Sequence, residues 1–304
     1  MTKFDQLLER CKKLAPIPTA VAHPCEVTAL EGALEAAELG LIVPILVGPA
    51  EKIRSLAKAH KIDLGKTEIV DVPHSHASAA RAVELVREGK AELLMKGSLH
   101  TDELLGAVIA RETGLRTQRR MSHVFLMDVP TYHKPILITD AAINIAPTLE
   151  DKVDICQNAI DLAKAFGVER PKVAILAAVE TVNSRMPATL DAAALCKMAD
   201  RKQIVGGVLD GPLAFDNAIS KEAAKTKGIV SDVAGDPDIL LVPDLEAGNM
   251  VAKLLSFLAK ADSAGLLLGA RVPIILTSRA DSVRSRIASC AVAMLAAHAR
   301  RRAA

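Results

Sequence analysis

The sequence has no tryptophan, and only 2% of its 304 residues are aromatic. Half of the residues are nevertheless hydrophobic, so the core must be built from Ala, Leu, Ile and Val. Such a core is expected for parallel strands that are buried on both faces. The length is sufficient for about two domains, at roughly 150 residues each.

No apolar run reaches the roughly 18 residues that a membrane span requires. Positively and negatively charged residues are nearly balanced in number. The net charge is +2 and charged residues make up 24% of the chain, so we expect neither a nucleic-acid partner nor a membrane partner. Residues 1–15 predict an amphipathic helix rather than a signal peptide. The five cysteines form no CxxC pair and are typical of reduced, mostly buried thiols. We therefore expect a cytoplasmic protein.

Several catalytic motifs are also missing. GxxxxGK[ST] and GxSxG do not occur, and no GxGxxG follows an early strand, which argues against a P-loop, a hydrolase elbow and a dinucleotide fingerprint. His23, His100 and His123 do not have a metal-binding spacing. We expect no metal site.

Apolar runs of strand length alternate with longer amphipathic runs almost throughout, as in 41–49 followed by 50–60. This alternation predicts an α/β fold with mostly parallel sheets. Residues 127–151 interrupt it with two extended runs, which indicates a domain boundary. The segment from 271 onward has no partner of its own, so we expect it to return to the first domain. The predicted domains are a discontinuous 1–136 plus 271–304, and a continuous 137–270.

Ligands in open parallel sheets collect at the carboxyl ends of strands, so polar residues at those ends are candidates for a binding site. After the strand-like run 93–95 come Lys96 and Gly97, then His100 near a helix start. A cation with backbone N–H groups can hold an anion there. The simpler interpretation is a surface lysine beside an ordinary helix cap.

Two further strand ends carry polar residues. Asp244, Gly248 and Asn249 follow one strand, where a small residue permits close approach of a ligand and Asp244 can also cap the next helix. Asp140 and Asn144 follow another strand and are candidates for lining a cleft. A capping box at 148–151 is expected to be structural.

The fourth strand end is TSRADS, residues 277–282, after the run VPIIL. Ser278 and Asp281 have the spacing of a capping box, which leaves Thr277 and Arg279 unexplained. A cation at a helix N-terminus opposes the helix dipole at a cost of about 0.3–1 kcal/mol unless an anion is bound there. The pattern therefore indicates a phosphate at this turn.

These motifs together resemble a known family. The chain resembles the phosphate acyltransferases, which include phosphate acetyltransferase and phosphate butyryltransferase. The resemblance is carried by four segments that occur in the order expected for that family: MKGSLHT (95–101), MSHVFLMDVPTY (121–132), VPDLEAGN (242–249) and TSRADS (277–282). The resemblance covers nearly the whole chain. It implies two three-layer α/β domains of the isocitrate/isopropylmalate-dehydrogenase-like type, with an active-site cleft between them, and a homodimer.

The implied activity is reversible transfer of an acetyl or butyryl group between coenzyme A and inorganic phosphate, which gives an acyl phosphate. Acyl-CoA, CoA and phosphate are then substrates, and no step requires a metal or redox cofactor. The resemblance also suggests an acyl kinase as a metabolic partner. The Ser-Arg pair of the family falls on Ser278 and Arg279. Its PDLxxGN segment falls on Pro243, Asp244, Leu245, Gly248 and Asn249.

The sequence departs from the acetyltransferase pattern at two positions. Ser285 stands where an acid is proposed as catalytic base, and Leu105 stands where an arginine is expected; both departures are more similar to the butyryltransferase branch. The acyl chain length and the base therefore stay open.

The transfer chemistry then assigns roles to residues. The CoA thiol needs a base to become a thiolate, for which Asp281 is our candidate and His100 the second. Arg279, Lys96 and backbone N–H groups are expected to stabilise developing negative charge, and Ser278 to hydrogen-bond the sulfur or phosphate. The expected catalytic residues are Ser278, Arg279 and Asp281, and the expected substrate-binding residues are Lys96, Gly97, His100, Asp140, Asn144, Asp244, Gly248, Asn249 and Thr277.

Two alternatives belong to other functional classes. A metal- and NAD-dependent decarboxylating dehydrogenase can have the same fold, but it needs clustered acids for a divalent ion, which the strand ends do not supply. A catalytically diverged acyl-CoA-binding protein is consistent with the departures at Ser285 and Leu105.

Overall fold

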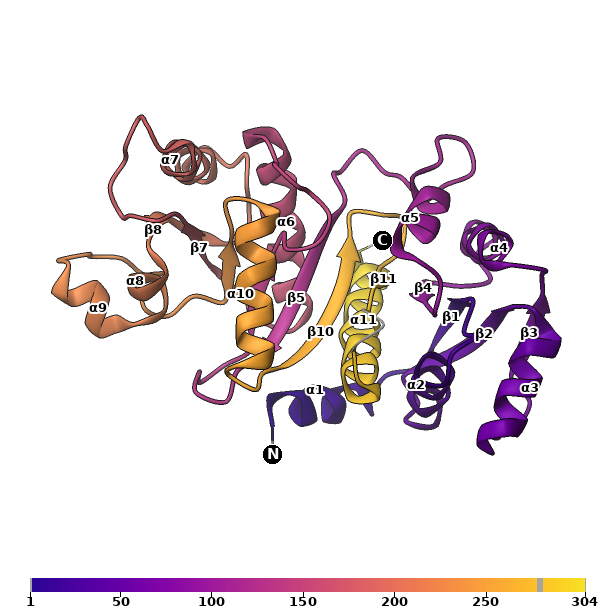
Figure 1. Ribbon diagram of the computed structural model, residues 1–304. Coiled ribbons are helices and arrows are strands. Elements are labelled where there is room, and N and C mark those ends of the chain that lie inside the picture. The colour runs from indigo at the N-terminus through magenta and orange to yellow at the C-terminus, as the bar shows by residue number, and fades with distance from the viewer. Residues whose placement is uncertain (1, 278–280, 304) are drawn as a thin grey trace. The chain divides into compact units, whose positions relative to one another are not determined.

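The chain folds as two compact α/β units in the computed structural model, which describes residues 2–277 and 281–303 (Figure 1). One unit comprises Met1–Arg119 and Ala264–Ala304, and the other comprises Arg120–Ser263. The C-terminal segment thus lies with the N-terminal part of the chain.

The sheet of the first unit has the strand order β3-β2-β1-β4-β11-β10 and is parallel except for the β10–β11 pair. Ala22 pairs with Lys96, and Met95 pairs with Ile275, so the carboxyl ends of three neighbouring strands lie side by side. The strands are β1 (Ile17–Ala22), β2 (Ile42–Gly48), β3 (Glu68–Asp71), β4 (Leu93–Lys96), β10 (Asp262–Leu268, whose last five residues belong to this unit) and β11 (Ile274–Ile275).

Helices cover both faces of this sheet. Figure 1 shows α4 and α5 on one face and α1, α2 and α11 on the other, where α11 packs against α1 and α2. The N-terminal helix predicted from the sequence is present and is capped by Thr2. The helices are α1 (Lys3–Cys11), α2 (Val27–Glu38), α3 (Ala50–His60), α4 (Ser75–Arg87), α5 (Thr101–Ile109) and α11 (Val283–Ala303).

The sheet of the second unit has the strand order β5-β6-β9-β7-β8. The first pair is antiparallel and the others are parallel. Ile138 and Leu240 pair at the centre, and both are at most 1% exposed, as expected for strands that helices cover on both faces. The strands are β5 (Ser122–Asp128), β6 (Ile136–Thr139), β7 (Lys172–Leu176), β8 (Val208–Leu213) and β9 (Ile239–Leu241).

The helices of the second unit form two groups. α6 packs against α7, β5 and β6, whereas α10 packs against β5 and β6 from the opposite face (Figure 1). The capping box predicted at 148–151 is confirmed at the start of α6. The helices are α6 (Leu149–Ala165), α7 (Pro187–Asp200), α8 (Phe215–Ile219), α9 (Lys221–Thr226) and α10 (Leu245–Phe257).

The division between units differs from the predicted 136/137 and 270/271. The chain enters the second unit at Arg120, before β5, because β5 pairs with β6 along the register from Val124–Thr139 to Met127–Ile136. It leaves that unit at Ser263, near the start of β10. The two extended runs that interrupt the alternation are therefore a hairpin-like pair within one unit.

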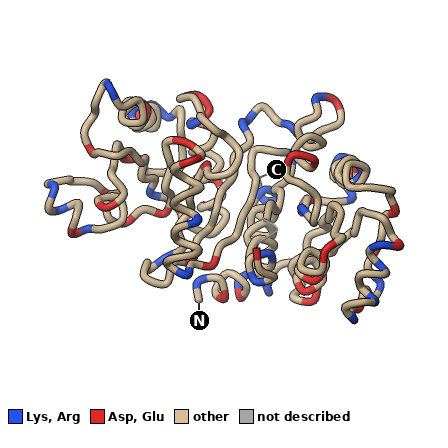
Figure 2. The backbone as a smooth tube through the Cα atoms, in the orientation of Figure 1, with Lys and Arg blue, Asp and Glu red and all other residues tan. Residues whose placement is uncertain are grey.

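Charges of both signs are interspersed along the backbone of each unit (Figure 2). Within the described ranges 2–277 and 281–303, no helix combines the length and the apolarity that crossing a membrane would need.

Candidate active site

The carboxyl ends of β4 and β11 bring three of the predicted residues together. Lys96 ends β4 and is only 2% exposed, so it is not the surface lysine of the simpler interpretation. Its Nζ lies 3.5 Å from the carbonyl oxygens of Gly97 and Thr277. Thr277 follows β11 and is also 2% exposed. A buried ammonium group therefore lies directly beside the TSRADS segment.

Gly97 allows this loop to pass against the end of β1. A Cβ atom at this position would lie 2.4 Å from the Ala22 carbonyl oxygen and 2.5 Å from that of His23, which no other residue tolerates. The N–H groups of Gly97 and Ser98 donate to these same carbonyls, at 2.8 and 2.9 Å. These two N–H groups are consequently engaged within the fold and do not point toward an anion.

His23 is a further polar residue of this edge that the sequence did not single out for binding. It adopts a positive φ of 56°, and its Nδ1 lies 3.1 Å from the Ser78 Oγ. Burial, followed by the nearby Lys52 ammonium, lowers the pKa of His23. The neutral imidazole is therefore favoured at neutral pH.

The start of α11 differs from the prediction. The helix begins at Val283, and Ser282 Oγ accepts a hydrogen bond from the Ser285 N–H at 3.2 Å. Asp281 lies before the helix rather than within its first turn, where the predicted capping box would place it. The same Ser-x-x spacing occurs twice in this segment, and the second serine is the one at the helix start. Ser278 and Arg279 lie outside the described residues.

Arg286 was missed by sequence reasoning. Its side chain is 1% exposed, and its Nη1 donates to the Thr277 Oγ1 at 2.8 Å. Burial lowers the pKa of Arg286, whereas the Asp281 carboxylate opposes that shift. Asp281 is thus close enough to interact electrostatically with this guanidinium. His100, by contrast, is exposed at the start of α5, and its N–H donates to Glu103 at 2.9 Å.

In the second unit, Asp140 organises the loop after β6. One carboxylate oxygen accepts the N–H groups of Ala142 and Ile143 at 2.9 and 3.0 Å. The other accepts the N–H of His123 at 3.2 Å and the side-chain amide of Asn144 at 2.5 Å. Asp140 is 2% exposed, so it shapes the loop through hydrogen bonds to the chain itself.

Asn144 in turn holds an arginine. Its Oδ1 accepts a hydrogen bond from Arg120 Nε at 2.8 Å, and its Nδ2 donates to the Met121 carbonyl at 2.9 Å. Arg120 Nη1 also lies 3.4 Å from Asp151, while about half of the side chain (53%) remains exposed. The guanidinium of Arg120 is therefore oriented by two residues of the second unit.

Asp244, Gly248 and Asn249 explain how α10 approaches this loop. Asp244 caps the helix by accepting the Ala247 N–H at 2.8 Å, as its position predicted. A Cβ atom at Gly248 would lie 2.7 Å from Val242 Cγ2 and 3.0 Å from the Asp140 carbonyl. Asn249 Nδ2 donates to the Ala141 carbonyl at 3.1 Å. The predicted residues of the second unit therefore form one packed group at the ends of β6 and β9.

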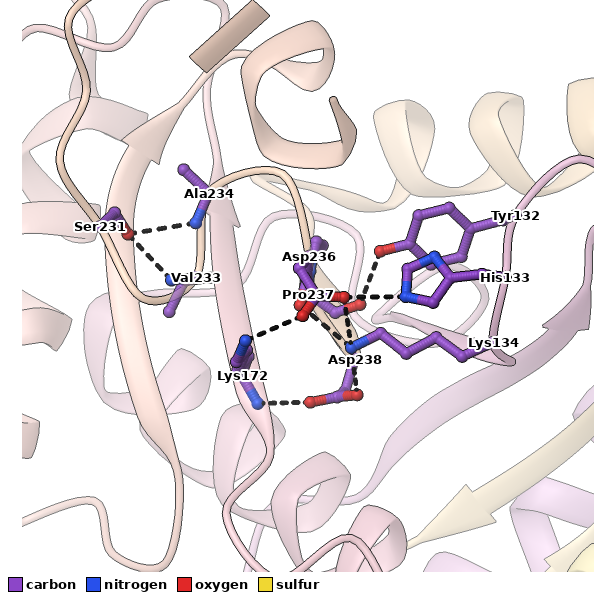
Figure 3. A network of polar contacts seen from close by, with 10 residues as sticks. All are labelled: Tyr132, His133, Lys134, Lys172, Ser231, Val233, Ala234, Asp236, Pro237 and Asp238. Atoms are coloured by element: carbon purple, nitrogen blue, oxygen red, sulfur yellow. Dashed lines mark hydrogen bonds and ion pairs between the residues drawn. The ribbon is translucent and has the colours of Figure 1, made fainter. Parts of the chain in front are cut away.

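A charged network that the sequence did not reveal lies at the opposite, amino ends of β6, β7 and β9 (Figure 3). The carboxylate oxygens of Asp236 lie 2.9–3.0 Å from the side-chain nitrogen atoms of His133, Lys134 and Lys172. Asp238 pairs with Lys134 at 2.7 Å. Burial opposes ionisation of Asp236, but the hydrogen bonds from Lys172 and Lys134 outweigh it and lower its pKa below the ordinary 3.8. The network joins segments far apart in the chain and is structural.

Asp236→Asn should lower the free energy of unfolding by about 1–2 kcal/mol at pH 7, because it removes charge-assisted hydrogen bonds that are partly screened by solvent. Since the folded-state pKa is depressed, this stabilisation is present above pH 3.8 and is lost as the pH falls through the folded value. Urea unfolding at pH 7 and at successive pH values below 3.8 should show two stability curves that stay apart at pH 7 and converge only below 3.8. Asp232→Asn, at an exposed neighbour, is the control; equal losses in both variants would contradict the assignment.

The fold and these groups define a class: two-unit α/β proteins with polar groups at the carboxyl ends of mostly parallel sheets. Among the described residues, no group of three or more His, Cys, Asp or Glu side chains is placed to hold a metal ion. A family model described as "Phosphate acetyl/butaryl transferase" matches residues 75–294, which is more than half of the chain. The chain belongs to this family, as the motifs predicted.

Relatives of the chain extend over its whole length. A phosphate acetyltransferase of Rhizobium meliloti is 67% identical over 100% of this chain and 96% of the relative. A phosphate butyryltransferase of Clostridium beijerinckii is 45% identical over 97% of both chains. A solved branched-chain phosphotransacylase from Enterococcus faecalis V583 is 30% identical, with a TM-score of 0.80 over 93% of this chain and 99% of that chain.

These comparisons confirm the predicted fold class and the predicted class of enzyme, an acyltransferase. A solved dehydrogenase at 13% identity also shares the fold, with a TM-score of 0.57. At that identity the likeness shows the fold alone.

Proposed function

We propose that this chain catalyses reversible transfer of a short acyl group between coenzyme A and inorganic phosphate, with acetyl as the preferred group. The observation that carries the proposal is the 67% identity to a phosphate acetyltransferase along the full chain. The butyryltransferase relative is less similar, at 45%. Ser285 and Leu105 therefore do not by themselves argue for a butyryl substrate.

The reaction proceeds through attack on a carbonyl carbon. In one direction a phosphate oxygen attacks the thioester, and the C–S bond breaks to release CoA thiolate. In the other, the CoA thiol gives its proton to a base, the thiolate attacks the acyl phosphate, and the C–O bond breaks to release phosphate. No atom changes its oxidation state in either direction, so the proposal includes no redox cofactor.

The charge that develops on the carbonyl oxygen and on phosphate requires positive groups. Lys96 and Arg279 are the proposed donors, with Ser278 as a hydrogen-bonding partner of the sulfur or phosphate. The buried Nζ of Lys96 beside Thr277 supports this role, because an ammonium group shielded from water attracts an anion more strongly than one in solvent. Asp281 stays the proposed base and His100 the second candidate.

Thiol release from acyl-CoA in the presence of phosphate tests the proposal. We expect rapid, phosphate-dependent release with acetyl-CoA and slower release as the acyl chain lengthens from two to six carbons. Binding of CoA without turnover would instead support the diverged acyl-CoA-binding protein. Faster turnover of butyryl-CoA would overturn the acetyl preference but leave the reaction class intact.

We also propose that the protein is a homodimer and that α10 contributes to the interface. Met250, Leu254, Phe257 and Leu258 recur at helical spacing and are 54–78% exposed in the single chain, which is typical of an apolar stripe that another surface covers. Glu246 lies one turn before Met250, and Lys253 lies beside Phe257. Antiparallel, two-fold pairing of the helix would bring these opposite charges together.

Leu254→Glu combined with Phe257→Glu should convert the protein to monomers, because burying two carboxylates at an interface is unfavourable. Light scattering coupled to gel filtration measures the mass directly. Val230→Glu, at a fully exposed apolar residue outside α10 (100%), is the matched control and should leave the mass unchanged. A dimer that survives the double substitution would place the interface elsewhere.

A cytoplasmic location is proposed as well. All five cysteines are free, and burial raises the pKa of the Cys290 thiol to about 12. Thiols that stay protonated and buried are typical of proteins in a reducing compartment.

A further inference from the structure

Arg286 carries a charge that the fold has removed from water. It is the largest of the side chains that are less than 2% exposed, and it lies in the first turn of α11. Burial of a guanidinium is unfavourable, as the lowered pKa of Arg286 reflects. An apolar residue of similar length would fill the same space without this cost. The retained charge therefore calls for a specific reason.

One hydrogen bond of Arg286 points to that reason. Its Nη1 donates to the Thr277 hydroxyl at 2.8 Å, and the carbonyl of the same threonine lies 3.5 Å from Lys96 Nζ. Two buried cations, Lys96 of β4 and Arg286 of α11, thus contact the carbonyl and the hydroxyl of one residue. Thr277 is the last described residue before Ser278 and Arg279 in the sequence.

A glycine makes room for this arginine. A Cβ atom at Gly32, inside α2, would lie 2.8 Å from Arg286 Cδ and 3.1 Å from Arg286 Cβ. Glycine is less favourable than alanine within a helix. Two locally unfavourable residues, a buried arginine and a helical glycine, therefore meet at one contact. Such choices are expected where function, rather than stability, selects the residues.

We propose that Arg286 is a positioning residue for acyl transfer: by holding the Thr277 hydroxyl, it fixes the chain at the point from which the Ser278–Arg279 pair extends. The inference rests on the proposed function. We assign the effect of Arg286 on the reaction to its hydrogen bond with the Thr277 hydroxyl. A purely structural arginine would stabilise the fold without influencing the rate.

Arg286→Met separates these two roles, because methionine keeps much of the apolar volume and removes the charge and the hydrogen bond. We expect the melting temperature to stay unchanged or to rise, and kcat to fall roughly 10- to 100-fold, as for the loss of one charge-assisted hydrogen bond. The KM for CoA should change little, since the group that is misplaced acts in the transition state. Arg286→Lys should recover part of the rate.

Thr277→Val provides an independent test, and it carries the inference if Arg286→Met does not fold. It should reduce kcat to a similar extent, and the double variant should be no slower than the slower single variant, because both changes break the same contact. Arg284→Met is the control: Arg284 lies two residues earlier in α11 but is 49% exposed, and its loss should leave kcat unchanged.

The outcomes distinguish this inference from the proposed function. A wild-type protein without transferase activity would contradict both the proposed function and the inference that rests on it. An active wild type with kcat within twofold of normal in folded Arg286→Met or Thr277→Val would overturn the inference alone. Rate losses that multiply in the double variant, or a rate loss matched by a fall in melting temperature, would also overturn it.

Discussion

Replacing Arg279 with alanine should slow acyl transfer by roughly 100- to 1000-fold, the loss expected when one donor to a developing oxyanion is removed. The tetrahedral intermediate and the departing phosphate both carry negative charge, and a guanidinium binds both with paired N–H groups. Arg279→Lys keeps the charge but not the forked geometry, so it should fall between the wild type and Arg279→Ala. Initial rates of thiol release with acetyl-CoA and phosphate measure the effect.

Arg271→Ala is the matched control for this series. Arg271 is an exposed arginine that precedes the same strand, β11, at its amino end, so its loss removes equal charge from the opposite end of the element. We expect its rate to stay within a factor of about two of the wild type. A fully active Arg279→Ala would remove the guanidinium from the proposed mechanism, whereas an equally slow Arg271→Ala would indicate a general charge effect.

Gly97→Ala should destabilise the first unit by about 3 kcal/mol or more and abolish activity at temperatures where the wild type is folded. The added Cβ would lie 2.4 Å from the Ala22 carbonyl oxygen and 2.7 Å from the His23 carbonyl carbon. These are backbone atoms fixed by strand pairing, so they cannot rotate away as a side chain would. Relief requires moving the end of β4, and Lys96 moves with it.

Gly106→Ala tests whether the loss is specific to close packing. Gly106 lies within α5, nine residues further along, and a Cβ there meets no atom within 4 Å. Alanine should therefore stabilise the helix by up to about 1 kcal/mol. Chemical unfolding of both variants gives the comparison. Similar stability of Gly97→Ala and the wild type would show that the strand ends are looser than the structure indicates.

Local signals in the sequence sufficed for much of the fold. The alternation of apolar runs predicted the parallel sheets, because strands buried on both faces need continuous apolar stretches. Thr148 with Asp151, and Asp244, have capping positions that depend only on residues within four of one another. The two Ser-x-x spacings in TSRADSVRS show the limit of such signals, since either serine can cap a helix and only the packing of α11 decides which one does.

Contacts between distant segments were beyond the sequence. In the sequence, Arg286 is an ordinary helical arginine, and only the structure shows that it packs against Gly32 of α2. Asp236 and Lys172 are 64 residues apart and meet only because β7 and β9 pair. Lys96 illustrates the same point, because the sequence predicted its position at a strand end but not its burial beneath Thr277.

The formation of acyl phosphate tests the central claim most directly. Phosphorus NMR of the pure protein with acetyl-CoA and inorganic phosphate should show a new acetyl phosphate signal that grows in step with free thiol. Adding excess CoA should then consume the acetyl phosphate and re-form acetyl-CoA and phosphate. Hydrolysis of acetyl-CoA without acetyl phosphate, or no change in either species, would contradict phosphate acyl transfer by this chain.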